Sequence, residues 1–552
     1  MSFAEAFGEN SAPSLISTRD GRVDLFFKLV RNVVKIPIAL KGAKGEVPET
    51  NPISYNEEHS LLFGLIDSSW SVSKLDTMRI LFNWRDCRGG KGDYWGFYHA
   101  MIHVIDIGYE WFAHNLDCIP HFGRFLDLVI LWHLIGVRLV LAPNNENYRS
   151  ARSLIVNYLV ERLKTDEELL SGDVKKDISL VAKWLPTEDG RWDVVDPKYL
   201  DNTKTGSYKD SFCKSFCKAL FNVAGDVTTE HLKKYRKEFL VPLRSHINIV
   251  ESHIVKRSYE ELDYSKVPSV AMKKYRKAFD RNDDERFKAF LEAVKRGDKE
   301  IKSDQVYPHD LVRIYMTQTR SADPDAVIEA QWKALREKAQ ATGAFDNCLV
   351  VCDVSGSMCG TPMEVAIALG LLGMNKNRVI TFSEDPQLHT IPDGSLQSQV
   401  MNMRSMGWGM NTDIVKVYDL VLNLMKEEES RIRRIFIFSD MQFDVAICNS
   451  GQRTHFEVVR DRFTQAELEM PQLIFWNLRG NTRDFPVRHD DEGVLLMSGY
   501  SPSLLQSLVD GDIPNPLALV SEIVNSERYS IVKDPHTPLA VGVQDTSHQD
   551  QT

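Results

Sequence analysis

Five oxygen-bearing side chains lie at or near the ends of apolar segments in the C-terminal part of the chain. Asp353, Ser355 and Ser357 follow the apolar run "LVVC", and Asp440 ends the run "IFIFSD". Thr412 lies between these runs in "GWGMNTD", directly before a helical pattern. All five offer oxygen, and oxygen-only ligation suits a hard cation such as Mg²⁺. The residue types therefore predict a divalent-cation site with at least one position left for water or for a partner's oxygen.

The elements that must position these side chains follow an alternating pattern after residue 345. Apolar runs of strand length, from "NCLVVCD" to "GVLLMSGY", alternate with helical patterns. Such alternation predicts a mostly parallel sheet covered on both faces. Ligands of these sheets lie beyond the carboxyl ends of the strands, so the five side chains are expected at one edge. The alternative, in which Asp353 and the two serines only cap a helix, leaves Thr412 and Asp440 without a role. Helices are expected at 362–375, 395–404, 413–429, 455–469, 502–510 and 515–526, with Asp413 as a helix N-cap.

Motifs of three catalytic classes are absent from the same segments. A phosphatase-type aspartyl nucleophile needs a second acid at position 355, which is Ser355. The stretch "GSMCG" has Met358 where a nucleophile elbow needs serine, and "RDCRGGKGDY" lacks the spacing of a phosphate-binding Walker loop. The motif segments contain no histidine that could serve as a general base. A metal-dependent hydrolase is therefore the weakest option, and a binding protein is expected.

The region before residue 345 has helical periodicity and no convincing series of strands. In "DLFFKLVRNVVK", for example, Leu25, Phe26, Leu29, Val30 and Val33 share one face. Many short amphipathic helices in succession predict a stacked body, a solenoid or ring, although no fixed repeat length is present. Helices are expected at 57–68, 74–84, 95–106, 124–141, 173–184, 209–223, 229–240, 242–256, 268–279, 283–296, 308–316 and 324–341.

Two kinds of cationic segment occur in this helical region. Arg85, Arg88 and Lys91 surround Gly89, Gly90 and Gly92, so this stretch is either a phosphate-holding turn or a tight interhelical turn whose cations are solvated or pair with acids. The second interpretation is slightly favoured. Basic runs beside Tyr235 and Tyr275 are either RNA contacts with base stacking or solvated helix faces. Their cations are Lys233, Lys234, Arg236, Lys237, Arg244, Lys256, Arg257, Lys273, Lys274, Arg276 and Lys277.

Charge and composition divide the chain near residue 345. Residues 346–552 carry 16 Lys and Arg against 28 Asp and Glu, whereas residues 1–345 carry 51 against 49. We therefore expect a disordered N-terminus at 1–20, a helical body at 21–343, an α/β domain at 344–532 and a disordered tail at 533–552. The eight cysteines have no zinc-site spacing, and no secretory signal or membrane span is evident, so an intracellular, cytoplasmic protein is expected.

The motifs also resemble known families. "DVSGSM", "NTD" and "SD" look like the metal-ion-dependent adhesion site of von Willebrand factor A domains. That resemblance implies a Rossmann-like fold in which Asp353, Ser355, Ser357, Thr412 and Asp440 hold Mg²⁺, Mn²⁺ or Ca²⁺ directly or through water. "NWRDCRGGKGDY" and "GWGMNTD" are similar to an uncharacterised family that joins a TROVE-like helical body to such a domain. The layout is more distantly similar to Ro ribonucleoprotein autoantigens, which implies a HEAT-like ring that binds small structured or misfolded RNAs.

The sequence departs from that family pattern at Cys87 and at Asp93–Tyr94, where an apolar residue and Glu–Arg are usual. The missing arginine weakens the case for a phosphate contact in this turn. Two functions remain open. The first is a non-enzymatic binding protein for structured or single-stranded RNA, with an acidic protein partner at the metal. The second is a protein-interaction scaffold whose A-domain metal captures a carboxylate of a partner, without an RNA ligand.

Overall fold

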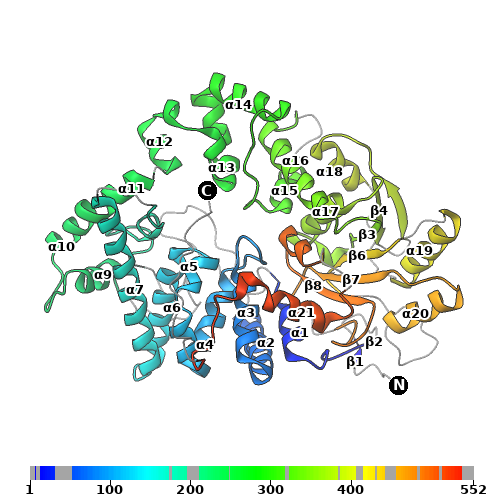
Figure 1. Ribbon diagram of the computed structural model, residues 1–552, viewed down its shortest axis with the longest axis horizontal. Coiled ribbons are helices and arrows are strands. Elements are labelled where there is room, and N and C mark those ends of the chain that lie inside the picture. Colours follow the sequence, from blue (N-terminus) through cyan, green and yellow to red (C-terminus); the bar gives the residue numbers. More distant parts are fainter. Residues whose placement is uncertain are drawn as a thin grey trace.

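The computed structural model describes residues 6–7, 13–30, 52–172, 177–194, 210–247, 249–317, 323–382, 386–405, 414–428, 432–441, 455–480, 485–508 and 513–537. A mostly helical body precedes a C-terminal mixed sheet (Figure 1). In Figure 1 the ribbon runs from blue helices at the bottom through cyan and green helices to the sheet at the right, and the red C-terminal helix returns beside the blue start. The described chain therefore forms a closed circuit.

The first part of the body consists of helices that pack on their neighbours in chain order. Helix α6 shows why they form, because its apolar residues are buried on nearly every side and Asp127 in its first turn accepts a hydrogen bond from the Arg124 backbone N–H. The helices are α1 (Gly21–Lys28), α2 (Pro52–Val72), α3 (Lys74–Arg85), α4 (Trp95–His114), α5 (Cys118–Phe122), α6 (Phe125–Leu141), α7 (Glu146–Ser171), α8 (Val181–Trp184), α9 (Phe212–Leu220), α10 (Thr229–Lys234), the π-helix η2 (Tyr235–Leu240) and α11 (Val241–Ile247).

The second part of the body has its own small core. Residues of α12 to α14, among them Tyr264 and Phe279, form a hydrophobic cluster that includes Val327 of α16 and is separate from the main core. Helices α15 and α16 then pack against α17 of the C-terminal domain. These elements are α12 (Val250–Lys256), η3 (Tyr259–Glu261), η4 (Tyr264–Lys266), α13 (Ser269–Asn282), α14 (Asp284–Arg296), α15 (Pro308–Thr317) and α16 (Ala326–Ala341).

The C-terminal sheet has six strands in the order β5-β4-β3-β6-β7-β8. All neighbouring strands are parallel except β4 and β5, which are antiparallel. The chain leaves β3 toward β4 on one side and later returns to β6 on the other side, so β3 and β6 flank the point where the strand order reverses. The strands are β3 (Cys348–Asp353), β4 (Arg378–Phe382), β5 (Gln387–Thr390), β6 (Arg434–Ser439), β7 (Gln472–Asn477) and β8 (Val494–Ser498).

Helices pack against this sheet from several sides. Helix α17 contacts β3 and β6, α19 contacts β4 and α20, and α1 and α21 contact β8. Helix α1 therefore belongs spatially with the C-terminal domain although it lies near the start of the chain (Figure 1). The remaining elements are η5 (Gly356–Met358), α17 (Thr361–Gly373), α18 (Leu396–Ser405), α19 (Ile414–Glu428), α20 (His455–Gln465), η6 (Pro502–Leu508), α21 (Pro516–Asn525), η7 (Glu527–Tyr529) and the two-residue strands β1 (Ala6–Phe7) and β2 (Pro13–Ser14).

Polar contacts close the circuit between the first helices and the end of the sheet domain. Arg528 donates to both carboxylate oxygens of Asp86, at 2.7 Å for Nη2 to Oδ1, and the Tyr529 hydroxyl donates to Asp86 Oδ2 at 3.1 Å. Asn115 exchanges two hydrogen bonds with the backbone of Lys533, at 2.8 and 2.9 Å. The turn after α3 and the segment after α21 thus form one joint.

Four sequence-based expectations need correction. The helix expected at 173–184 covers only α8, and the one expected at 242–256 is divided into α11 and α12. Residues 13–20 do not belong to a disordered terminus, because Leu15 is buried and its backbone pairs with that of Phe485. Residues 533–537 are likewise placed by the Asn115 contacts. No helix among the described residues is long and apolar enough to cross a membrane.

Candidate metal centre

The ends of β3 and β6 bring two of the predicted carboxylates to the same edge of the sheet. The strands pair in parallel with Cys352 opposite Phe438, so Asp353 and Asp440 follow at adjacent carboxyl ends. Both residues are 0% exposed. Apolar residues along each strand are buried on both faces of the sheet, and this fixes the strand ends firmly. The predicted convergence of Asp353 and Asp440 is therefore present in the structure.

Hydrogen bonds hold the Asp353 carboxylate in place. The Ser355 backbone N–H donates to Oδ1 at 2.9 Å, and the Ser439 hydroxyl donates to Oδ2 at 2.5 Å. The sequence analysis did not single out Ser439, although it directly precedes Asp440 at the same strand end. Its contact joins β6 to the carboxylate that ends β3.

The two predicted serines lie in the turn that follows β3. Ser355 is buried, and its hydroxyl oxygen lies 3.0 Å from that of Ser357. Ser357 belongs to the short helical turn η5, which leads toward α17. Two hydroxyl oxygens therefore lie close together within four residues of Asp353, as oxygen ligation requires.

Asp353, Ser355, Ser357 and Asp440 form a group that we call the strand-end site. The electrostatics of this site favour a cation. Burial, followed by the charge of Asp440, raises the pKa of Asp353 to about 7. A cation between the carboxylates would relieve this repulsion. One cation is already near, because Nη1 of Arg479 lies 3.9 Å from Asp440 Oδ2 and donates to the Ser357 carbonyl oxygen at 3.1 Å. The sequence analysis missed Arg479, although its place just after a strand, in "FWNLR", was a usable signal.

Two further expectations lie outside the described residues. Thr412 and Asp413 fall in the segment between α18 and α19 that the structure leaves undescribed. Within the described part of the chain, no group of three or more His, Cys, Asp or Glu side chains is arranged to hold a metal. A cation at the strand-end site would therefore need the serine hydroxyls as well as the two carboxylates. Asp353, Ser355, Ser357 and Asp440 offer the donor set that a hard cation prefers.

The glycine turn after α3 is a structural joint in the described chain. A Cβ atom at Gly90 would lie 2.1 Å from the Asn83 carbonyl oxygen, so the tight turn requires glycine there. Arg85 is buried and pairs with Asp127 at 2.6 Å. Lys91 is fully buried and donates to Phe26 O and to Ser498 Oγ. The prediction of Arg85 and Lys91 as phosphate contacts is therefore corrected, because both cations face the protein interior.

The other predicted cations divide into exposed and engaged groups. Lys273 pairs with Asp310 at 2.9 Å and Arg276 with Asp325 at 2.6 Å, and Tyr235 is buried with its hydroxyl donating to Pro186 O. Lys273 and Arg276 are held in ion pairs, which corrects their tentative assignment as RNA contacts. Because Tyr235 is buried, its ring cannot stack on a base, and that prediction is corrected too. The exposed cations are Arg88, Lys233, Lys234, Arg236, Lys237, Lys256, Arg257, Lys274 and Lys277.

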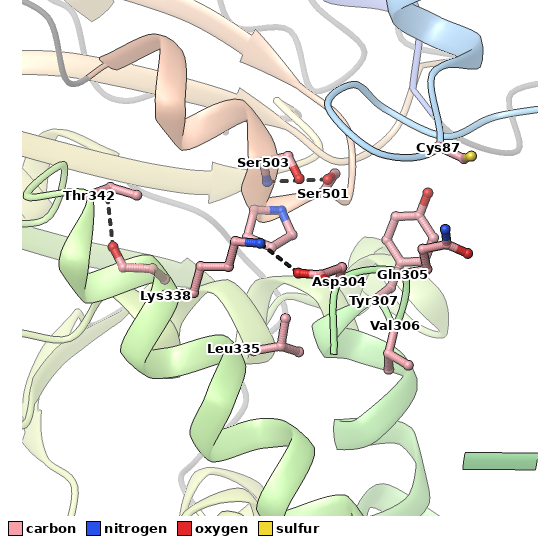
Figure 2. A pocket seen from close by; sticks show the side chains of 12 residues that line it. Cys87, Asp304, Gln305, Val306, Tyr307, Leu335, Lys338, Thr342, Ser501 and Ser503 are labelled. Carbon is pink, nitrogen blue, oxygen red and sulfur yellow. Dashed lines mark hydrogen bonds and ion pairs between the residues drawn. The ribbon is translucent and has the colours of Figure 1, made fainter. Parts of the chain in front are cut away.

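A pocket lies apart from these residues, where the joint meets α15 and α16. Its walls come from the turn after α3, the segment before α15, α16 and the start of η6 (Figure 2). Lys338 and Asp304 form an ion pair at 2.6 Å in this pocket, and Ser501 accepts from the Ser503 backbone N–H at 3.2 Å. None of the predicted site residues lines this pocket.

Comparison with known proteins gives two family models and one extensive relative. Residues 138–345 match "Domain of unknown function (DUF2828)" and residues 347–542 match "Domain of unknown function (DUF7788)". The two matched regions meet between α16 and β3.

The crystal structure of the Deinococcus radiodurans Ro (RSR) protein aligns with a TM-score of 0.34 and 16% identity, covering 89% of this chain and 100% of that chain. This alignment is too distant to establish a common fold.

The "Uncharacterized protein L728" of Acanthamoeba polyphaga mimivirus is much closer in sequence. It is 30% identical over an alignment of 494 positions that covers 83% of this chain and 80% of that protein. A match of this extent spans both the helical body and the sheet domain. The chain therefore belongs to the same protein family as L728 of Acanthamoeba polyphaga mimivirus.

Proposed function

We propose that this protein is a non-enzymatic, intracellular binding protein whose C-terminal domain is of the von Willebrand A type and holds a divalent cation at the strand-end site. The proposal rests on one observation. Asp353 and Asp440 lie at neighbouring strand ends, beside Ser355 and Ser357. Thr412 is expected to complete the set. The seven described cysteines are free thiols, which supports a reducing compartment.

Each residue has a definable task in this proposal. Asp353 and Asp440 supply negative charge, and the hydroxyls of Ser355 and Ser357 supply neutral oxygens. Ser439 holds the Asp353 carboxylate through its 2.5 Å hydrogen bond. A bound Mg²⁺, Mn²⁺ or Ca²⁺ would supply a centre that takes an acidic oxygen from a protein partner.

Titration of the purified protein with Mn²⁺, followed by electron paramagnetic resonance of the free ion, tests this site. The wild type should bind one Mn²⁺ that Mg²⁺ displaces, and Asp353→Ala should lose it. Asp393→Asn is the control, because Asp393 is an exposed carboxylate of the same domain that accepts from Asn377. Equal Mn²⁺ binding by the wild type and Asp353→Ala would exclude the proposed site.

RNA is the second candidate ligand, favoured by a specific cationic surface. Lys233, Lys234, Arg236 and Lys237 are all exposed on α10 and η2, and α9 packs beside α10 with exposed Lys214 and Lys218. We call these six side chains the α9–η2 surface. These exposed cations on neighbouring elements suit phosphate contacts, whose affinity falls steeply with salt, although Lys234 also forms an exposed ion pair with Glu238 at 3.7 Å. A protein scaffold without an RNA ligand would instead show no salt-sensitive binding of structured or single-stranded RNA in a filter assay.

A further inference from the structure

Arg479 lies at the rim of the strand-end site and reaches it from a third strand. It follows β7, whose carboxyl end lies beside that of β6 in the sheet. Its guanidinium Nη1 lies 3.9 Å from Asp440 Oδ2, and the same atom donates to the carbonyl oxygen of Ser357 at 3.1 Å. One side chain therefore touches both segments that are expected to hold the metal.

The backbone of Arg479 is fixed while its side chain remains partly open to water. The Arg479 N–H donates to Asn477 Oδ1 at 2.9 Å, and the Asn477 amide group donates to the Phe27 carbonyl oxygen of α1 at 3.2 Å. The Arg479 side chain is nevertheless 41% exposed, whereas that of Asp440 is 0% exposed. The guanidinium can thus move outward into solvent without disturbing the end of β7.

A metal ion and the guanidinium would compete for the same negative charge. Two cations that share the Asp440 carboxylate repel each other, and this repulsion is less screened at a buried group than in water. The contact at 3.9 Å is long for an ion pair, and the charge of a bound divalent ion would replace that of the guanidinium beside buried Asp440 when the contact breaks. Breaking it also frees the Ser357 carbonyl oxygen.

We propose that Arg479 is the internal counter-ion of the strand-end site, which neutralises Asp440 in the absence of metal and is displaced when a divalent cation binds. The inference rests on the proposed function of this site and adds its regulation. Arg479 weakens metal binding by competition, and metal binding releases a positive charge to the surface at the place where an acidic partner would arrive. The site therefore takes up metal only where the ion is abundant enough to displace the guanidinium.

Mn²⁺ titration of the full-length wild type and of Arg479→Gln tests this inference. Arg479→Gln removes one positive charge near a divalent ion at a partly exposed site. This change should tighten Mn²⁺ binding by on the order of tenfold. Arg479→Lys keeps the charge and should remain within about threefold of the wild type. Arg462→Gln is the matched control, because Arg462 is 38% exposed, pairs with Asp419 in the same domain and lies on α20.

The outcomes separate this inference from the proposed function. Unchanged or weaker Mn²⁺ binding by Arg479→Gln, with a normal wild-type titration, would overturn the counter-ion role alone. Equal tightening in Arg479→Lys would also overturn it, since charge would then not be the cause. A wild type that binds no Mn²⁺ would remove the proposed site and the inference together. Circular dichroism and thermal unfolding of each variant show whether the fold is retained.

Discussion

At the scale of single residues, the proposed metal site depends on two fully buried carboxyl groups. Asp353 and Asp440 are both 0% exposed, and the charge of Asp440 contributes to the raised pKa of Asp353. Burial of like charges is costly unless a cation or hydrogen bonds compensate. Ser439 and the Ser355 backbone N–H provide part of this compensation, and Arg479 provides a distant positive charge. A divalent cation would provide the rest.

A second residue of interest is Lys91, which is buried where the turn after α3 meets α1 and β8. Burial lowers the pKa of its ammonium group well below 10.5. A lysine whose folded-state pKa is lowered binds fewer protons in the folded than in the unfolded state, so its contribution to stability rises with pH up to the unfolded value. Between the lowered folded-state pKa of Lys91 and about pH 10, the free energy of unfolding of the wild type should therefore rise with pH relative to that of Lys91→Met, by at most about 1.4 kcal/mol per pH unit.

Denaturant unfolding of both proteins across this pH range measures the difference. Equal pH slopes for the wild type and Lys91→Met would show that Lys91 keeps its proton in the folded state. Lys74, an exposed lysine at the start of α3, offers the control Lys74→Met, which makes the same substitution at the surface.

At the scale of secondary-structure elements, local patterns predicted most of the architecture. The strands of the sheet and the change from helices to alternating strands were readable, because buried parallel strands are continuous apolar runs. The meeting of Asp353 and Asp440 followed from strand order alone. The separation of α11 from α12 could not be predicted from the sequence, since no proline or glycine lies between the two helices.

Whether an individual Lys or Arg side chain is buried or exposed could not be predicted from its spacing in the sequence. Arg85 is buried because Asp127, on a later helix, lies beside it, and Lys91 is buried because Ser498 of β8 accepts its hydrogen bond. Both partners are remote in sequence. Lys233 and Lys234 remain exposed because they lie on the face of α10 opposite buried Leu232 and Tyr235. Tertiary contacts, rather than local composition, therefore separate structural cations from those that are free to contact a ligand.

The α9–η2 surface gives a prediction at this scale. Reversal of its four cations on α10 and η2 to glutamate should weaken RNA binding by at least about tenfold and should reduce the dependence of affinity on salt, because each lost phosphate contact removes about one unit of the salt slope. Filter binding at several salt concentrations measures both quantities. The reversed residues are Lys233, Lys234, Arg236 and Lys237.

Reversal of four exposed cations on and after α14 provides the matched control. Lys288, Lys295, Arg296 and Lys299 change the net charge by the same amount on a different element. If both quadruple variants lose RNA binding equally, general charge rather than the α9–η2 surface determines affinity. If the wild type binds no RNA at low salt, the scaffold function is favoured.

At the scale of the whole molecule, closure of the circuit depends on contacts between the two ends of the chain. Asp86 is 0% exposed and accepts hydrogen bonds from Arg528 and Tyr529, and Asn115 holds the backbone of Lys533. No local pattern predicts this joint, because its partners are more than four hundred positions apart, as the sequence separation of 442 between Asp86 and Arg528 illustrates. The expected disordered tail from residue 533 fails at Lys533 for the same reason, because Lys533 is held by Asn115.

Arg528→Ala should open this joint. The variant leaves the Asp86 carboxylate buried without its charged partner, which typically costs about 3 kcal/mol. Amide hydrogen exchange should then increase both in the turn after α3 and in residues 527–537, while protection in β3 and β6 is retained. Arg296→Ala, which removes an exposed pair with Asp298, is the control. Unchanged exchange in both segments would mean that the other contacts suffice to keep the circuit closed.

The most direct test of the central claim is a crystal structure of the full chain in the presence of Mn²⁺, with anomalous scattering measured at the manganese edge. We expect one strong anomalous peak bounded by oxygens of Asp353, Ser355, Ser357 and Asp440, with Thr412 near it and the guanidinium of Arg479 turned outward. Manganese found only elsewhere on the protein, with these four side chains arranged as they are without metal, would contradict this expectation.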